Sequence, residues 1–87
     1  MTTAPTVRTK DITPGPGGVM TVEVGVVTGP LTLRTGLASS GEVTLMVQYK
    51  DADEWYAVQG GTAHLSVPDD LDPVHTMAVG LLNRPNG

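Results

Sequence analysis

Three small groups of residues carry side chains that could do chemistry, and the first is acidic. Asp51, Asp53 and Glu54 resemble the start of a calcium-binding loop, in which alternate residues supply oxygen ligands. The resemblance ends at the sixth and twelfth positions, where such a loop needs glycine and glutamate but this chain has Tyr56 and Thr62. We therefore interpret this stretch as an acidic, solvent-exposed turn.

The other two groups contain the histidines. His64 and Ser66 are a base and a hydroxyl two positions apart, but no orienting carboxylate or oxyanion-binding loop can be assigned to them from the sequence. Asp72 and His75 are three positions apart and would share one face of a helix, yet two ligands do not make a metal site. We expect no catalytic residue, no metal and no cofactor, and hence a protein that is not an enzyme.

Composition excludes several other classes of protein. The chain has 87 residues, enough for one domain, and it has no cysteine for disulfides or thiolate metal sites. Nine acidic residues outnumber five scattered basic ones, which disfavours nucleic-acid binding. The sequence shows neither a signal peptide nor an apolar run long enough to span a membrane, so we expect a location in the cytoplasm or in a virion.

The first part of the chain differs from the remainder. Residues 1–18 are rich in Thr, Pro and Gly and end in Pro-Gly-Pro-Gly-Gly, a composition typical of a flexible arm. Val7 and Ile12 are the candidates within this arm for docking onto a partner, as in a short added strand. Residues 19–87 then form the single predicted domain.

From Val19 onward the apolar residues alternate with period two, as in half-buried strands, and we expect the first set, Met20, Val22, Val24 and Val26, to face the core. Turn residues interrupt the alternation four times, and we expect Gly60-Gly61 to close a tight hairpin because glycine tolerates positive φ. Antiparallel pairing then predicts four facing pairs: Val26 with Leu31, Leu37 with Val43, Tyr49 with Tyr56, and Val58 with Ala63.

The pattern changes to helical spacing after Pro68. Leu71, Val74, Ala78 and either Leu81 or Leu82 recur at intervals of three and four, and acids and a proline precede them. The sequence thus predicts a mainly β (α+β) fold, a five-stranded antiparallel meander with one C-terminal helix on one face and an extended N-terminal arm.

The predicted pairing also assigns residues to the face of the sheet away from the helix. Because Trp55 and Tyr56 are neighbours, a regular strand can turn only one of them toward the helix. One interpretation is an ordinary solvated face with an ion pair between Glu23 and Arg34. The other interpretation is a contact surface for a partner. It has five candidate residues, of which Gln59 is predicted to lie opposite Met46: Trp55, Met46, Arg34, Gln59 and His64.

The function predicted from these observations is a small, non-catalytic protein–protein interaction or assembly module. Its partner would be another protein or a copy of itself, for example as an accessory component of a phage virion. The alternative is a module that binds a small molecule or peptide in a pocket between helix and sheet, lined by Tyr49, Tyr56 and Met77. A small enzyme that uses His64 is a weaker third hypothesis.

Overall fold

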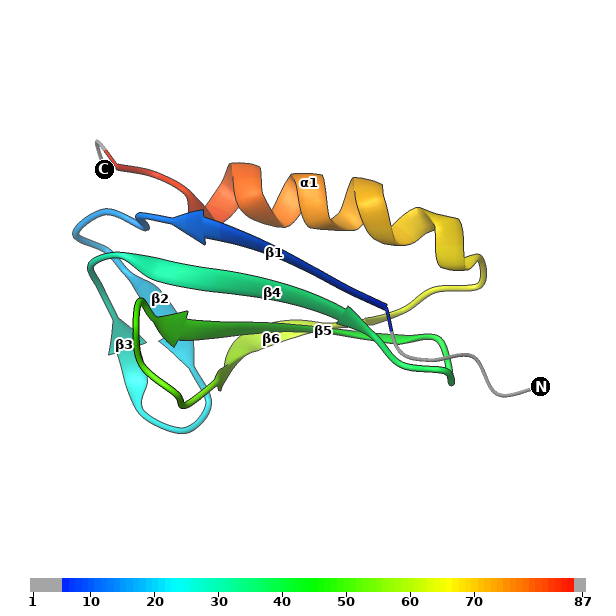
Figure 1. Cartoon of the computed structure of the whole chain (residues 1–87), viewed down its shortest axis with the longest axis horizontal. Coiled ribbons are helices and arrows are strands. Elements are labelled where there is room, and N and C mark those ends of the chain that lie inside the picture. Colours follow the sequence, from blue (N-terminus) through cyan, green and yellow to red (C-terminus); the bar gives the residue numbers. More distant parts are fainter. Residues whose placement is uncertain (1–5, 86–87) are drawn as a thin grey trace.

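The computed structural model describes residues 6–85, which form one antiparallel sheet with a helix packed against one face (Figure 1). The strands are β1 (Thr6–Ile12), β2 (Val19–Thr21), β3 (Gly25–Val27), β4 (Leu31–Leu37), β5 (Glu42–Tyr49) and β6 (Tyr56–His64). A 3-10 turn (Pro68–Asp70) leads into α1 (Leu71–Leu82). The strand order is β1-β4-β5-β6-β2-β3, so the predicted class is confirmed with six strands in the sheet rather than five.

β1 occupies part of the segment that the sequence predicted to be a flexible arm. It pairs with β4 along its whole length, from Thr6 opposite Leu37 to Ile12 opposite Leu31. The prediction is therefore wrong for residues 6–12, and residues 1–5 of the arm lie outside the described residues. The strand is stabilised because Ile12 enters the core at 3% exposure and because Arg8 Nε lies 2.8 Å from Asp72 Oδ1 at the start of α1.

The segment after β1 folds into a small hairpin of its own. We expected it to pair with β4 through Val26 and Leu31, but β2 pairs with β3 instead, with Met20 opposite Val26. Thr21 closes the turn, since its Oγ1 donates to the Gly25 carbonyl at 2.7 Å and accepts from the Val24 amide at 3.2 Å. Gly25 has φ of 76°, a conformation that glycine adopts without steric cost.

This turn reverses which side chains face the core. Val19 and Val27 are 2% and 1% exposed, whereas the four alternating residues that the sequence assigned to the core are on the surface. These four, the exposed hairpin residues, are Met20, Val22, Val24 and Val26, with exposed fractions of 48%, 68%, 53% and 51%. Met20 and Val26 face each other on the side of the strands away from the core, and Val22 and Val24 lie in the turn between β2 and β3.

The centre of the sheet is the pair β4 and β5, whose predicted register is confirmed. Leu37 faces Val43 and Leu33 faces Val47. The next pair differs, because Tyr56 faces Val47 rather than Tyr49. The glycine pair Gly60-Gly61 does not close a hairpin, because both residues lie inside β6. Gly60 has φ of 75°, and the register between β5 and β6 shifts in this part of the strand, so that Ala63 faces Val43.

The helix covers the face of the sheet toward which Leu31, Leu33 and Val47 point, each with 0% exposure. Ala78 packs into the same cluster, and Leu71 joins a second one with Leu37 and Val43. The predicted helical spacing is therefore confirmed. Leu82 packs against the core and Leu81 is 68% exposed, which settles the choice between the two.

The helix also makes one polar contact with the buried face. Thr35 on β4 is fully buried, and its Oγ1 lies 2.8 Å from His75 Nδ1. His75 thus serves as the hydrogen-bonding partner of a core threonine.

In the described part of the chain, no helix has the length and apolar character needed to cross a bilayer.

Candidate functional site

The face of the sheet away from α1, called the outer face below, carries a cluster centred on Arg34. Arg34 on β4 lies opposite Met46 on β5, and its Nη2 donates to Met46 Sδ at 3.4 Å. The guanidinium carbon lies 4.7 Å from the centre of the Trp55 ring. The long Arg34 side chain is therefore packed against an aromatic ring and a sulfur atom on the outer face.

Trp55 and Tyr56 point in opposite directions, as the sequence predicted. Trp55 stacks with Arg34 on the outer face, and Tyr56 packs against the core cluster under the helix. The Tyr56 ring meets Tyr49 edge to face, with centroids 6.4 Å apart and planes at 80°. The single tryptophan is thus held on the outer face by its neighbours in the chain and by its contact with Arg34.

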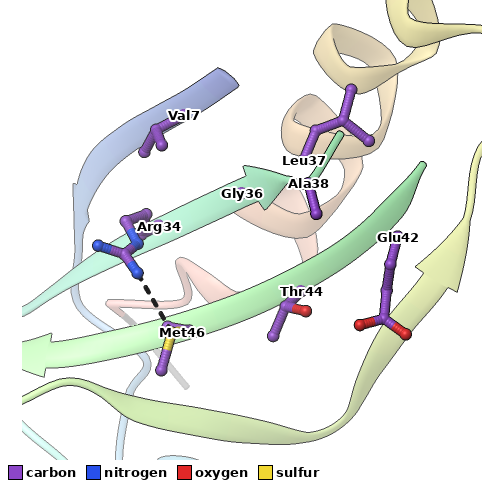
Figure 2. A pocket seen from close by; sticks show the side chains of 8 residues that line it. All are labelled: Val7, Arg34, Gly36, Leu37, Ala38, Glu42, Thr44 and Met46. Carbon is purple, nitrogen blue, oxygen red and sulfur yellow. Dashed lines mark hydrogen bonds between the residues drawn. The ribbon is translucent and has the colours of Figure 1, made fainter. Parts of the chain in front are cut away.

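A hollow of about 290 Å³ lies beside this cluster on the outer face (Figure 2). Its floor is made of small or apolar side chains, and Arg34 and Glu42 stand at opposite ends of it (Figure 2). Gly36 contributes to the depth of the hollow because it has no side chain. The lining residues are Val7, Arg34, Gly36, Leu37, Ala38, Glu42, Thr44 and Met46.

Four of the predicted binding candidates come together here, and three do not. Arg34, Met46 and Val7 line the hollow, and Trp55 adjoins it through Arg34. Gln59 is exposed on β6, but Met46 faces Ala57 rather than Gln59 because the hairpin of β5 and β6 pairs Val47 with Tyr56.

The other two candidates lie elsewhere. His64 is at the end of β6 opposite Glu42, and its ring packs so closely over Gly41 that a Cβ there would lie 2.8 Å from its Cε1. Ile12 was predicted to be available to a partner, which is wrong, because it is 3% exposed within the core. It is buried because β1 pairs with β4 instead of extending away from the domain.

The ion pair predicted between Glu23 and Arg34 is absent from the contacts of the described residues. β2 lies next to β6 rather than β4, and Glu23 Oε1 accepts a hydrogen bond from the Ala57 amide at 2.9 Å. Arg34 contacts Trp55 and Met46 instead. The carboxylate of Glu23 therefore helps to join the hairpin to the sheet.

The alternative pocket between helix and sheet does not assemble as predicted. Met77 is 66% exposed on α1, roughly a third of a turn away from the buried Ala78 side, and Tyr49 is 41% exposed at the end of β5. Tyr49 and Tyr56 contact each other, but Met77 does not join them in lining a cavity under the helix. Met77 was assigned there because its apolar side chain follows the helical run closely.

The residues considered for acid–base or metal chemistry take part in structural contacts instead. Among residues 6–85, no carboxylate oxygen forms an ion pair with His64, and no three potential metal ligands gather at one place. Asp72 contacts Arg8, and His75 contacts Thr35. Asp51 takes φ of 68° in the turn after β5, where the Ala52 amide donates to the Tyr49 carbonyl at 2.9 Å.

Sequence reasoning missed five residues of the hollow, namely Gly36, Leu37, Ala38, Glu42 and Thr44. Gly36 and Thr44 face each other across β4 and β5, so the correctly predicted register already placed both on the outer face. The alternation of β4 therefore contained a signal for the hollow, because it places a glycine at the outward-facing position that follows Arg34.

Comparisons of this chain with models of protein families, with curated proteins and with solved structures found no match.

Proposed function

We propose that this chain is a small, non-catalytic protein–protein interaction or assembly module and that the outer face of its sheet is the contact surface. The observation that carries the proposal is the Arg34 side chain, which contacts the Trp55 ring and Met46 Sδ beside a hollow of about 290 Å³. An accessory component of a larger particle, such as a phage virion, is one setting in which a domain of this size would use such a surface.

The residue types support a protein partner. Trp, Met and Arg are enriched at the centres of protein interfaces, where they supply a large contact area and a charge in one patch. Here Arg34 already contacts both Trp55 and Met46 in the isolated chain. Binding would therefore cost less side-chain entropy than it would if a free arginine had to be immobilised.

The proposal can be tested by site-specific photo-crosslinking. Thr44, which lines the hollow, is replaced by a photoreactive phenylalanine analogue, and the same analogue at Met77 on the helix serves as the matched control. The variants are irradiated as purified protein and in an extract of the native host cells. We expect a protein adduct from position 44 that weakens with Trp55→Ala, and little adduct from position 77.

Absence of any protein adduct from position 44 under both conditions would contradict the proposal. Equal adduct formation from positions 44 and 77 would contradict it as well, because collisions in solution would then explain both.

A further inference from the structure

We infer that the partner of the outer face is a second copy of this chain, docked face to face about a two-fold axis so that Arg34 of each copy meets Glu42 of the other. The inference rests on the proposed function, because it names the partner of the same surface. Its basis is the way in which charge is distributed across the hollow.

The two charges are separated by the length of the hollow. Arg34 on β4 lies opposite Met46 on β5, and Glu42 lies four residues before Met46 on the same strand. At about 3.3 Å per residue this separation is roughly 13 Å along the strand. Gly36 and Thr44, which carry no charge, lie between the two ends (Figure 2).

Both charges remain available for a partner. Among residues 6–85 the ion pairs are Arg8 with Asp72 and Lys50 with Asp11, so neither Arg34 nor Glu42 takes part in one. Arg34 is held by a ring face and a sulfur, which leave guanidinium N–H groups free to donate to a carboxylate. Glu42 is exposed at the start of β5.

This arrangement is self-complementary. In a two-fold symmetric interface the same patch is used by both copies, so that residue i of one copy meets residue j of the other and the reverse. An axis through the middle of the hollow, near Gly36 and Thr44, places each arginine on the partner's glutamate. Opposite charges then meet twice, and the small residues in the middle let the two sheets approach closely.

The exposed hairpin residues Met20, Val22, Val24 and Val26 are a rival surface. They carry no charge that would fix the orientation of a second copy. On the outer face, Arg34 and Glu42 give charge complementarity between two copies, and it is the surface that the observations favour. Contact through the hairpin is therefore one of the outcomes that the test must be able to report.

The test uses two charge-reversal variants of the whole chain, Arg34→Glu and Glu42→Arg, in sedimentation and light-scattering measurements. We expect the wild type to form particles of twice the 9.0 kDa chain mass. Each variant brings like charges together twice in its own dimer and should associate at least about a hundredfold more weakly. An equimolar mixture restores both opposite-charge contacts, so two variants that do not self-associate should associate with each other.

Three further variants keep the test decisive if Arg34→Glu disturbs the fold. Glu42→Gln removes the exposed carboxylate at one end of the hollow. It should weaken the dimer and leave the circular dichroism spectrum unchanged. Arg84→Glu makes the same change of charge two residues after α1, and Val24→Asp places a charge in the hairpin; both should leave the dimer intact.

Several results would overturn the inference. A wild type that stays monomeric at millimolar concentration would do so, as would a failure of the two charge-reversal variants to associate when mixed. Loss of the dimer in Val24→Asp would place the contact on the hairpin. A monomeric wild type that crosslinks from position 44 to a different protein would contradict self-association but would support the proposed function. A monomer that forms no such adduct would contradict both self-association and the proposed function.

Discussion

The two faces of β4 carry neighbouring residues with different tasks. Leu33 is fully buried under α1 among aliphatic side chains, and Arg34, the next residue, lies on the outer face against Trp55 and Met46. Burial on the helix side stabilises the fold by removing apolar surface from water. The outer face instead keeps a charged side chain ordered at the surface, an arrangement that contributes little to stability and is suited to recognition.

The largest expected effect comes from the buried neighbour. Leu33→Ala should lower the free energy of unfolding by about 2 to 5 kcal/mol, because it leaves a cavity in the main core cluster. Urea denaturation followed by circular dichroism measures this loss. Arg34→Ala is the matched control and should cost about 1 kcal/mol, since it removes a half-buried cation–π contact. Equal losses for the two variants would show that the faces do not differ as described.

Two threonines on β4 allow the same comparison of the buried and outer faces, with smaller expected changes in stability. Thr35 is fully buried and bonds to His75, whereas Thr32 on the outer face donates to the exposed Asp11 carboxylate at 2.9 Å. Thr35→Val should cost about 0.5 to 1.5 kcal/mol in free energy of unfolding because it removes a buried hydrogen bond. Thr32→Val should lower the free energy of unfolding by roughly a few tenths of a kcal/mol, because water can replace the lost hydrogen-bond partner.

Thermal unfolding of both threonine variants, measured in parallel, gives this difference. If Thr32→Val proved the more destabilising substitution, the outer face would have to be regarded as part of what holds the fold together.

The part of the fold that could be predicted is the part with uninterrupted patterns. β4 and β5 alternate without a break around a Ser-Ser-Gly turn, and α1 repeats at helical spacing, so class, central register and helix position followed from the sequence. β1 was missed because its two aliphatic residues, Val7 and Ile12, fall on opposite faces and give no period of two. Pairing with β4, a tertiary effect, decides its structure.

Two errors came from glycines. Gly25 and Thr21 fold residues 19–27 into a hairpin, although the alternating valines suggested one continuous strand. Gly60 lies in an irregularity within β6, although the glycine pair suggested a turn. Both glycines adopt positive φ. The pairing with neighbouring strands decides whether a glycine with positive φ forms a turn or a bulge.

The site was predictable to the same extent as the central register. Arg34 and Met46 were placed together on the outer face because the pairing of β4 with β5 was correct, and Trp55 because Tyr56 fills the core. The hollow was not predictable, since it depends on Val7 from β1 and on the missing side chain of Gly36.

The most direct test of the account is a ¹⁵N nuclear magnetic resonance titration of the purified wild-type chain against its own concentration. If the outer face is the contact surface between two copies, the amide shifts that move with concentration should cluster at Gly36, Thr44 and Met46 and leave α1 unchanged. Shifts that cluster at Val22 and Val24, or on α1, would contradict the account.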